Sequence, residues 1–168
     1  MFISQDTCHN AVRAIITSRL DYANSLLFGI NSKLTQRLQR VQNRAAKLIF
    51  RCRKYDHVSP LIRELHWLTI QKRIHFKLLT IVFKCFTDSD NVPSYLTELT
   101  IQYVPTRPGL RSSQDTRLLT VPFTRTVAGA NGFYAAAPKL WNSLPYYIRH
   151  ASSLATFKSQ LKSYLFDM

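Results

Sequence analysis

The stretch that decides the fold runs from Lys33 to Arg51 and reads KLTQRLQRVQNRAAKLIFR. Apolar side chains recur in it at alternating steps of four and three residues, the spacing that places them on one face of an α-helix. They are Leu34, Leu38, Val41, Ala45 and Leu48. Asn31 or Ser32 precedes them and can cap the first turn. The pattern predicts a helix from about Lys33 to Phe50 that turns this apolar row toward a core.

A second row on the same stretch is entirely basic. Its members, again spaced at four and three, are Lys33, Arg37, Arg40, Arg44, Lys47 and Arg51. At 3.6 residues per turn, this row lies about 100° around the helix from the apolar row. The interval between Asp21 and Asp56 contains eight Lys or Arg and no acid, whereas solvated helix faces usually mix both signs. The row therefore favours contact with a polyanion, and a merely solvated face is the alternative.

The composition of the whole chain is that of a basic, folded protein. Its 168 residues include 23 Lys or Arg and 9 Asp or Glu, a formal net charge of +14, and 46% are hydrophobic. This apolar fraction supports a core and excludes general disorder, and the length predicts one domain, or one with a small appendage. The charge predicts nucleic acid as the partner. A membrane is the weaker candidate, because the apolar row is needed for folding.

Helical patterns flank the basic stretch on both sides. The segments expected to be helical are 6–16, 22–28, 59–65, 70–86, 93–96, 134–141 and 153–165. Asp6 or Thr7, Thr69, and Ser152 or Ser153 can supply caps, and Gly29 ends the second segment. Residues 100–125 contain loop formers such as Pro108 and Gly109, and a strand-like run at 118–121 predicts a short β-hairpin. The expected fold is mainly α, with a helical bundle at 1–99 and a loop-rich extension at 100–168 that packs on it and ends in a helix.

No arrangement of side chains in the sequence points to catalysis or to a bound metal. The cysteines Cys8, Cys52 and Cys85 lie far apart, and the five histidines show no zinc-ligand spacing. Asp88 and Asp90 form the only close acidic pair, which is typical of a turn or a cap. We therefore expect no catalytic residue, no metal site, no cofactor and no enzymatic activity. Free thiols, without a signal peptide or membrane-spanning run, predict an intracellular protein, nuclear or cytoplasmic and not secreted.

The aromatic residues admit two interpretations. Trp67 and Trp141 each adjoin a leucine, which favours core positions over platforms on which bases stack. Tyr146 and Tyr147 suit either role.

Short motifs along the chain carry a resemblance to a known family. They are DYANSLL at 21–27, LQRVQN at 38–43, ELHWL at 64–68, RI at 73–74, PSYL at 93–96, LRSS at 110–113, AAPKLWNSLP at 136–145, IR at 148–149 and FK at 157–158. In this order they resemble the region that follows the catalytic palm in LINE-type, jockey-like non-LTR retrotransposon reverse transcriptases. Three positions depart from the family pattern: Ala23 replaces a common Cys, Thr69 a Pro, and Asn131 an Arg. The last departure argues against a phosphate contact at that position.

This resemblance implies that the chain is a fragment. In such enzymes the Tyr-x-Asp-Asp catalytic motif lies upstream of this region, and the sequence contains no such motif. The helical first part would be similar to the thumb, which grips the template–primer duplex. The basic row would supply that grip through phosphate contacts, with Gln36, Gln39 and Asn43 as neutral hydrogen-bonding neighbours.

The expected function is therefore that of a non-catalytic fragment of an RNA-directed DNA polymerase. It would bind an RNA or DNA duplex, or a template–primer hybrid, through backbone phosphates and independently of sequence. Two alternatives stay open: a helical protein-interaction module whose basic face docks an acidic partner, and an unexpressed relic of a truncated element. Preference for duplex over heparin would separate the first alternative from nucleic-acid binding, and detection of the protein in cells would exclude the second.

Overall fold

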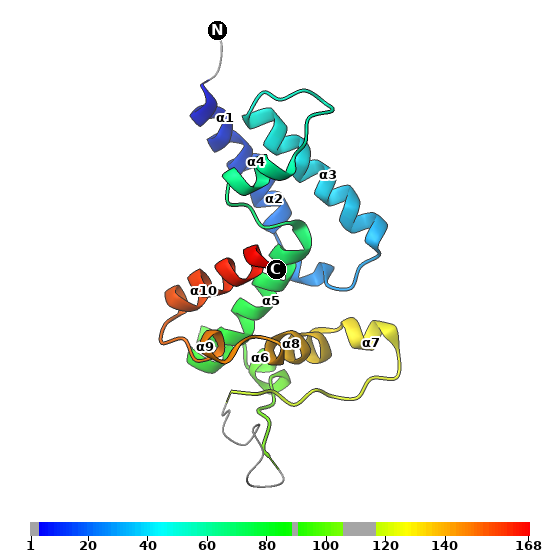
Figure 1. Ribbon diagram of the computed structural model, residues 1–168. Coiled ribbons are helices and arrows are strands. Elements are labelled where there is room, and N and C mark those ends of the chain that lie inside the picture. The colour runs from blue at the N-terminus through cyan, green and yellow to red at the C-terminus, as the bar shows by residue number, and fades with distance from the viewer. Residues whose placement is uncertain (1–3, 89–90, 106–116) are drawn as a thin grey trace. The chain divides into compact units, whose positions relative to one another are not determined.

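The computed structural model describes residues 4–88, 91–105 and 117–168 (Figure 1). These residues are mainly helical, as the sequence predicts. The chain divides into two compact units, Met1–Ile74 and His75–Met168, and the boundary falls inside helix α5 (Ile70–Thr87). The sequence-based division at residue 99 thus lies within the second unit. Ser89 and Asp90, the loop residues Pro108 and Gly109, and the motif at 110–113 lie outside the described residues.

The first unit is built almost entirely from helices. α1 (Gln5–Val12), a π-helical turn (Arg13–Thr17) and α2 (Ser18–Asp21) follow one another without a break, and a 3-10 turn (Asn24–Leu27) comes next. α3 (Ser32–Ile49) and α4 (Ser59–Glu64) precede the first turns of α5. The expected helix at 22–28 is only the short 3-10 turn, which is followed by Gly29 in the left-handed region with a φ of 72°.

The first helix begins earlier than the sequence pattern suggested. Its cap is Ser4, whose hydroxyl accepts a hydrogen bond from the Thr7 backbone N–H at 3.2 Å. The prediction of Asp6 or Thr7 as the cap is wrong, because both lie inside the first turn, where Asp6 favours the positive end of the helix dipole.

The core of the first unit lies between α1 and α3. Val12 of α1 packs against Ala45 and Ile49 of α3, with Leu65 and Trp67 at the edge of this cluster. Figure 1 shows α1 and α4 beside α3. The small side chain of Ala45 lets the two helices approach closely, and this brings the larger Val12 and Ile49 into contact.

α3 turns a different face to this core than its leucine spacing predicts. Its buried residues are Gln42, Ala45, Ala46 and Ile49, whereas Leu34, Val41 and Leu48 are 48%, 43% and 57% exposed. The prediction of an apolar row buried from Leu34 to Leu48 is therefore wrong, except at Ala45. Two alanines allow close packing, and the Gln42 amide is tolerated in the core because it is hydrogen-bonded, as described below.

The second unit surrounds the remainder of α5. Its other helices are α6 (Ser94–Leu99), α7 (Val127–Asn131), α8 (Phe133–Asn142), α9 (Tyr146–Arg149) and α10 (Leu154–Asp167). Phe83 of α5 stacks on Phe157 of α10 with ring centroids 4.2 Å apart, and Phe86 stacks on Trp141 of α8 at 5.3 Å. Trp141 is completely buried, which confirms its predicted place in a core.

The predicted cap of α10 is confirmed, and α8 contains a proline in its interior. Ser153 caps α10, because its hydroxyl accepts from the Thr156 backbone N–H at 3.1 Å, and the helix buries Phe157, Leu161 and Leu165. Pro138 lies inside α8, although proline is usually found at helix ends. Its ring is buried there, and it cannot donate to the carbonyl one turn earlier.

The described part of the loop-rich segment contains an antiparallel bridge between Gln102 and Leu119. Two backbone hydrogen bonds accompany it, Tyr103 N–H to the Leu118 carbonyl at 2.9 Å and Thr120 N–H to the Ile101 carbonyl at 2.8 Å. No strand forms within 4–88, 91–105 or 117–168. The hairpin stays a prediction, because the residues that would form its turn lie outside the described ranges.

Replacing Asn31 by alanine is expected to lower the free energy of unfolding by about 1 kcal/mol, the usual cost of losing a cap. Its side chain accepts a hydrogen bond from the Lys33 backbone N–H at 2.8 Å at the start of α3. Denaturation followed by circular dichroism measures the loss. Ser32→Ala is the matched control, because Ser32 is already the first helical residue, and a change below about 0.5 kcal/mol is expected. Equal losses in both variants would contradict the assignment of Asn31 as the cap.

Candidate nucleic-acid interface

The first four members of the basic row lie exposed along α3: Lys33, Arg37, Arg40 and Arg44. With successive residues about 100° apart around the helix axis, their mean direction lies about 160° from that of the four buried residues. The basic row thus occupies the side of α3 opposite the core. Within the part of the chain that the structure describes, no hydrogen bond or ion pair engages the side chains of Arg37, Arg40 and Arg44.

The last two members of the row are placed differently. The Lys47 ammonium donates to the backbone carbonyl of Lys54 at 2.7 Å, and Lys47 is only half-exposed. Arg51 follows the end of α3, where its backbone has a φ of 52°. Because the helix ends at Ile49, Arg51 does not continue the row. Five of the six predicted site residues therefore share the register of α3, and the four from Lys33 to Arg44 are the exposed ones among them.

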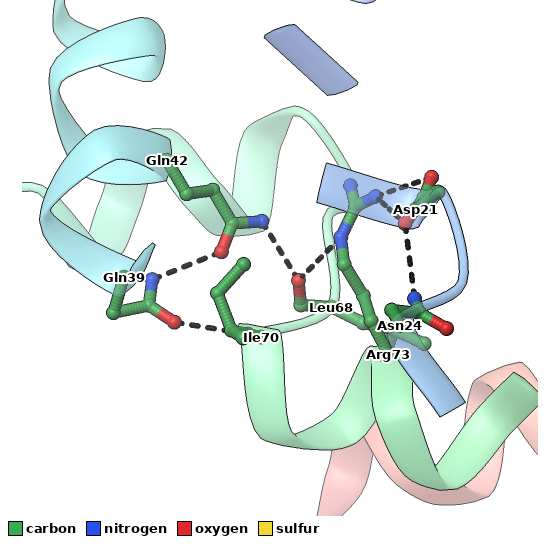
Figure 2. Close-up of polar contacts among 7 residues, drawn as sticks. All are labelled: Asp21, Asn24, Gln39, Gln42, Leu68, Ile70 and Arg73. Atoms are coloured by element: carbon green, nitrogen blue, oxygen red, sulfur yellow. Dashed lines mark hydrogen bonds and ion pairs between the residues drawn. The ribbon is translucent and has the colours of Figure 1, made fainter. Parts of the chain in front are cut away.

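Of the three neutral side chains expected beside the row, Gln36 is exposed, whereas Gln39 and Asn43 make hydrogen bonds within the fold. Gln39 accepts the Ile70 backbone N–H at 2.9 Å at the start of α5, and it donates to the side-chain oxygens of Gln42 and Asn43 at 3.0 and 2.8 Å. Gln42 in turn donates to the Leu68 carbonyl at 2.8 Å (Figure 2). The prediction that Gln39 contributes to a ligand-binding face is wrong, because its amide is occupied by these contacts.

An ion pair continues this polar network. Arg73 donates from its ε nitrogen to the same Leu68 carbonyl at 3.1 Å, and its guanidinium meets both oxygens of Asp21 at 2.7 and 2.8 Å (Figure 2). Asn24 donates to Asp21 as well, at 3.5 Å. The network therefore links four of the motifs noted in the sequence, those around Asp21, Gln39, Leu68 and Arg73. In this structure the polar residues of those motifs hold the first unit together.

A groove runs beside the exposed arginines, which the sequence analysis did not predict. Its cavity volume is about 580 Å³. The apolar side chains that line it are Leu27, Ile30, Leu34, Leu38 and Val41, and Arg37, Arg40 and Arg44 complete its wall. The apolar row from Leu34 to Val41 could have indicated this groove. Its spacing, however, is the one expected of a helix face that packs against a core.

Arginines of the second unit have structural roles. The Arg149 guanidinium is buried and donates to the backbone carbonyls of Asn142 and Leu144. Arg117 donates to the Arg149 carbonyl at 2.8 Å, and its own carbonyl accepts the indole N–H of Trp141. Asn142 pairs with the backbone of Leu119 in both directions, at 3.0 and 2.8 Å. These contacts tie the bridge segment to α8 and α9.

Two titratable side chains of α5 are uncharged at neutral pH. Burial lowers the pKa of His75, which keeps its imidazole neutral. Burial raises the pKa of the Cys85 thiol, which keeps it protonated and unsuited to attack as a thiolate. Neither side chain adds charge to the basic face.

The described residues contain neither a group of metal ligands nor a membrane-spanning helix. No three His, Cys, Asp or Glu side chains within these ranges are grouped as metal ligands. None of the helices described is long and apolar enough to cross a membrane.

Comparison with family models, with curated proteins and with solved structures finds no match to this chain.

Proposed function

We propose that this chain is the thumb-like, non-catalytic part of a LINE-type RNA-directed DNA polymerase and that it binds nucleic acid through backbone phosphates. The observation that carries the proposal is the exposed row of Lys33, Arg37, Arg40 and Arg44 on the side of α3 away from the core. Four cations on one rigid helix form a continuous strip of positive charge that attracts a polyanion. The motif order in the sequence supports the identity of that polyanion as a template–primer duplex.

The spacing of the row fits a phosphate backbone. Lys33 and Arg44 are eleven residues apart on one helix, a span of about 16 Å at 1.5 Å per residue. Long Arg and Lys side chains from such a span can reach several phosphates of one strand, and phosphate contacts carry no sequence information. The binding we propose is therefore independent of sequence, as the grip of a polymerase on its own product must be.

Purified protein is expected to bind duplexes of unrelated sequence with equal affinity. Four phosphate contacts predict a log–log slope of affinity against salt of about −3.6 on a B-form duplex. Fluorescence anisotropy with a DNA duplex, an RNA–DNA hybrid and an RNA duplex, each over a range of salt, gives the three slopes.

Heparin is the control for this measurement, because it presents anionic charge without the regular geometry of a duplex. The proposed function predicts that duplex competes better than heparin at equal charge concentration. If heparin competes as well as any duplex, charge alone explains the binding, and the alternative of a basic module for an acidic partner is favoured.

A further inference from the structure

The groove beside the basic row has the composition of a peptide-binding site. Leu34 and Val41, which line it, are both aliphatic and remain 48% and 43% exposed although they belong to a well-formed helix. Leu27 and Ile30, from the turn and the loop that precede α3, line it as well. Exposed aliphatic side chains gathered in one concave surface are typical of an interaction site.

The shape of the groove suits a helix. Leu34 and Val41 are seven residues apart on α3, a distance of about 10 Å or two helical turns. A second helix lying along α3 would present apolar side chains with the same spacing, at positions i, i+3 or i+4, and i+7. Among the residues that the structure describes, no aromatic side chain lines the groove, so that they offer a base no flat surface on which to stack.

The positive charge beside the groove favours an occupant that carries negative charge. Arg37, Arg40 and Arg44 line it, and none of them is engaged by another described residue. Three such guanidiniums beside an apolar lining complement a helix that carries acids next to its apolar stripe. Lysine-rich or neutral helices would lack this complementarity.

The 168 residues themselves do not supply such a helix. Their acids are Asp6, Asp21, Asp56, Glu64, Asp88, Asp90, Glu98, Asp115 and Asp167. No two of them are three or four residues apart, the spacing that would place them together on one helix face. A second copy of this sequence is therefore a poor occupant. The expected occupant is a segment of another protein with acids grouped on one helix face.

We propose that the groove formed by Leu27, Ile30, Leu34, Leu38 and Val41 binds an acidic amphipathic helix from a protein partner. This interaction goes beyond nucleic-acid binding and uses the same three arginines, so that the two ligands exclude one another. An acidic partner bound in the groove would thereby release or block the nucleic acid.

The test uses the whole chain and a synthetic peptide of about 16 residues, roughly 24 Å of helix. The peptide carries leucines at i, i+4 and i+7 with glutamates flanking them, and a fluorophore at one end. Its control has the same composition in an order that destroys the apolar stripe. We expect the amphipathic peptide to bind at least about tenfold more tightly than the control, and unlabelled DNA duplex to displace it.

Two sets of substitutions separate the groove from the basic row. The double variant L34A/V41A removes apolar side chains that are exposed in the free protein. It is expected to weaken peptide binding about tenfold or more while duplex affinity and its salt slope stay the same. The triple variant R37Q/R40Q/R44Q is expected to weaken both ligands. Circular dichroism melting establishes that each variant is folded before it is compared.

Two results would overturn the inference. The first is equal binding of the amphipathic and control peptides, which would reduce the effect to general charge attraction. The second is unchanged peptide affinity in folded L34A/V41A. If that variant then also loses affinity for a single-stranded oligonucleotide, the groove is assigned to unpaired bases. None of these results bears on the salt slope with duplex, so failure of this inference is distinguishable from failure of the proposed function.

Discussion

Replacing Trp141 by alanine is expected to lower the free energy of unfolding by about 3–5 kcal/mol. The indole is completely buried, stacks on Phe86 at 5.3 Å, and lies 5.9 and 6.5 Å from the rings of Phe157 and Phe83. Its N–H also donates to the Arg117 carbonyl, which would be left without that donor. Loss of the largest side chain of this aromatic cluster therefore creates a cavity and breaks a tie to the bridge segment. Chemical denaturation followed by far-ultraviolet circular dichroism measures the change.

Two further variants separate the contribution of the Trp141 hydrogen bond from that of its buried ring. Trp141→Phe keeps a ring beside Phe86 but removes the N–H, so we expect it to cost less than the alanine variant. Tyr147→Ala is the control for a large aromatic on the surface, because Tyr147 is 57% exposed, and a change below about 0.5 kcal/mol is expected. A loss below about 1 kcal/mol for Trp141→Ala would contradict its burial and restore base stacking as its role.

Much of the helical framework is predictable from the sequence, because it depends on local interactions. Asn31 and Ser153 cap helices through their own side chains, and the helix at 70–86 follows from a long apolar period. Such signals lie within a few residues of the structure that they determine. The same holds for Trp141, whose size and apolar neighbours predict burial in most folds.

The buried face of α3 is not predictable in this way, because it depends on contacts between distant residues. Gln42 is buried since the Leu68 carbonyl, 26 positions along the chain, accepts its amide. Gln39 faces α5 since the Ile70 N–H donates to it. Hydrophobic periodicity alone classes both as surface residues and assigns the core to Leu34, Val41 and Leu48 instead. The predicted apolar row thus lies about 70° around the helix from the face that is buried, and this error concealed the groove.

The predicted exposure of the basic row is not affected by this error, because charge is a more reliable guide to exposure than apolarity. A buried, unpaired Arg would be very costly, so a helix with four cations on one side keeps that side in solvent. Exposed leucines have no comparable cost. The exposed basic side of α3, on which a polyanion would bind, is therefore easier to predict from the sequence than the side on which α1 packs. Lys47 differs from these four because its ammonium donates to the Lys54 carbonyl, and Arg51 because it lies beyond the end of α3.

The triple variant R37Q/R40Q/R44Q is expected to flatten the log–log salt slope of duplex binding by two to three units, about 0.9 for each phosphate contact removed on a B-form duplex. The three side chains project from the solvent side of α3 and are not engaged by other described residues. Their loss should therefore leave folding intact, with a change below about 0.5 kcal/mol, and it relieves repulsion between like charges. RNA–DNA hybrids differ in form from B-DNA, so the same trend is expected there with a different coefficient. Salt titrations of wild type and variant by fluorescence anisotropy give the two slopes.

The matched control removes the same number of charges from the second unit. Lys139, Lys158 and Lys162 are exposed on α8 and α10, and their change to glutamine lowers the net charge by the same three units. Arg117 is unsuitable for this purpose, because its guanidinium donates to the Arg149 carbonyl. If long-range attraction alone drives binding, both triple variants flatten the slope equally. If the α3 row contacts the phosphates, only the arginine variant does so, because direct contacts release bound counterions and a distant charge does not. Identical slopes for wild type and a folded arginine variant would reduce the row to a solvated face.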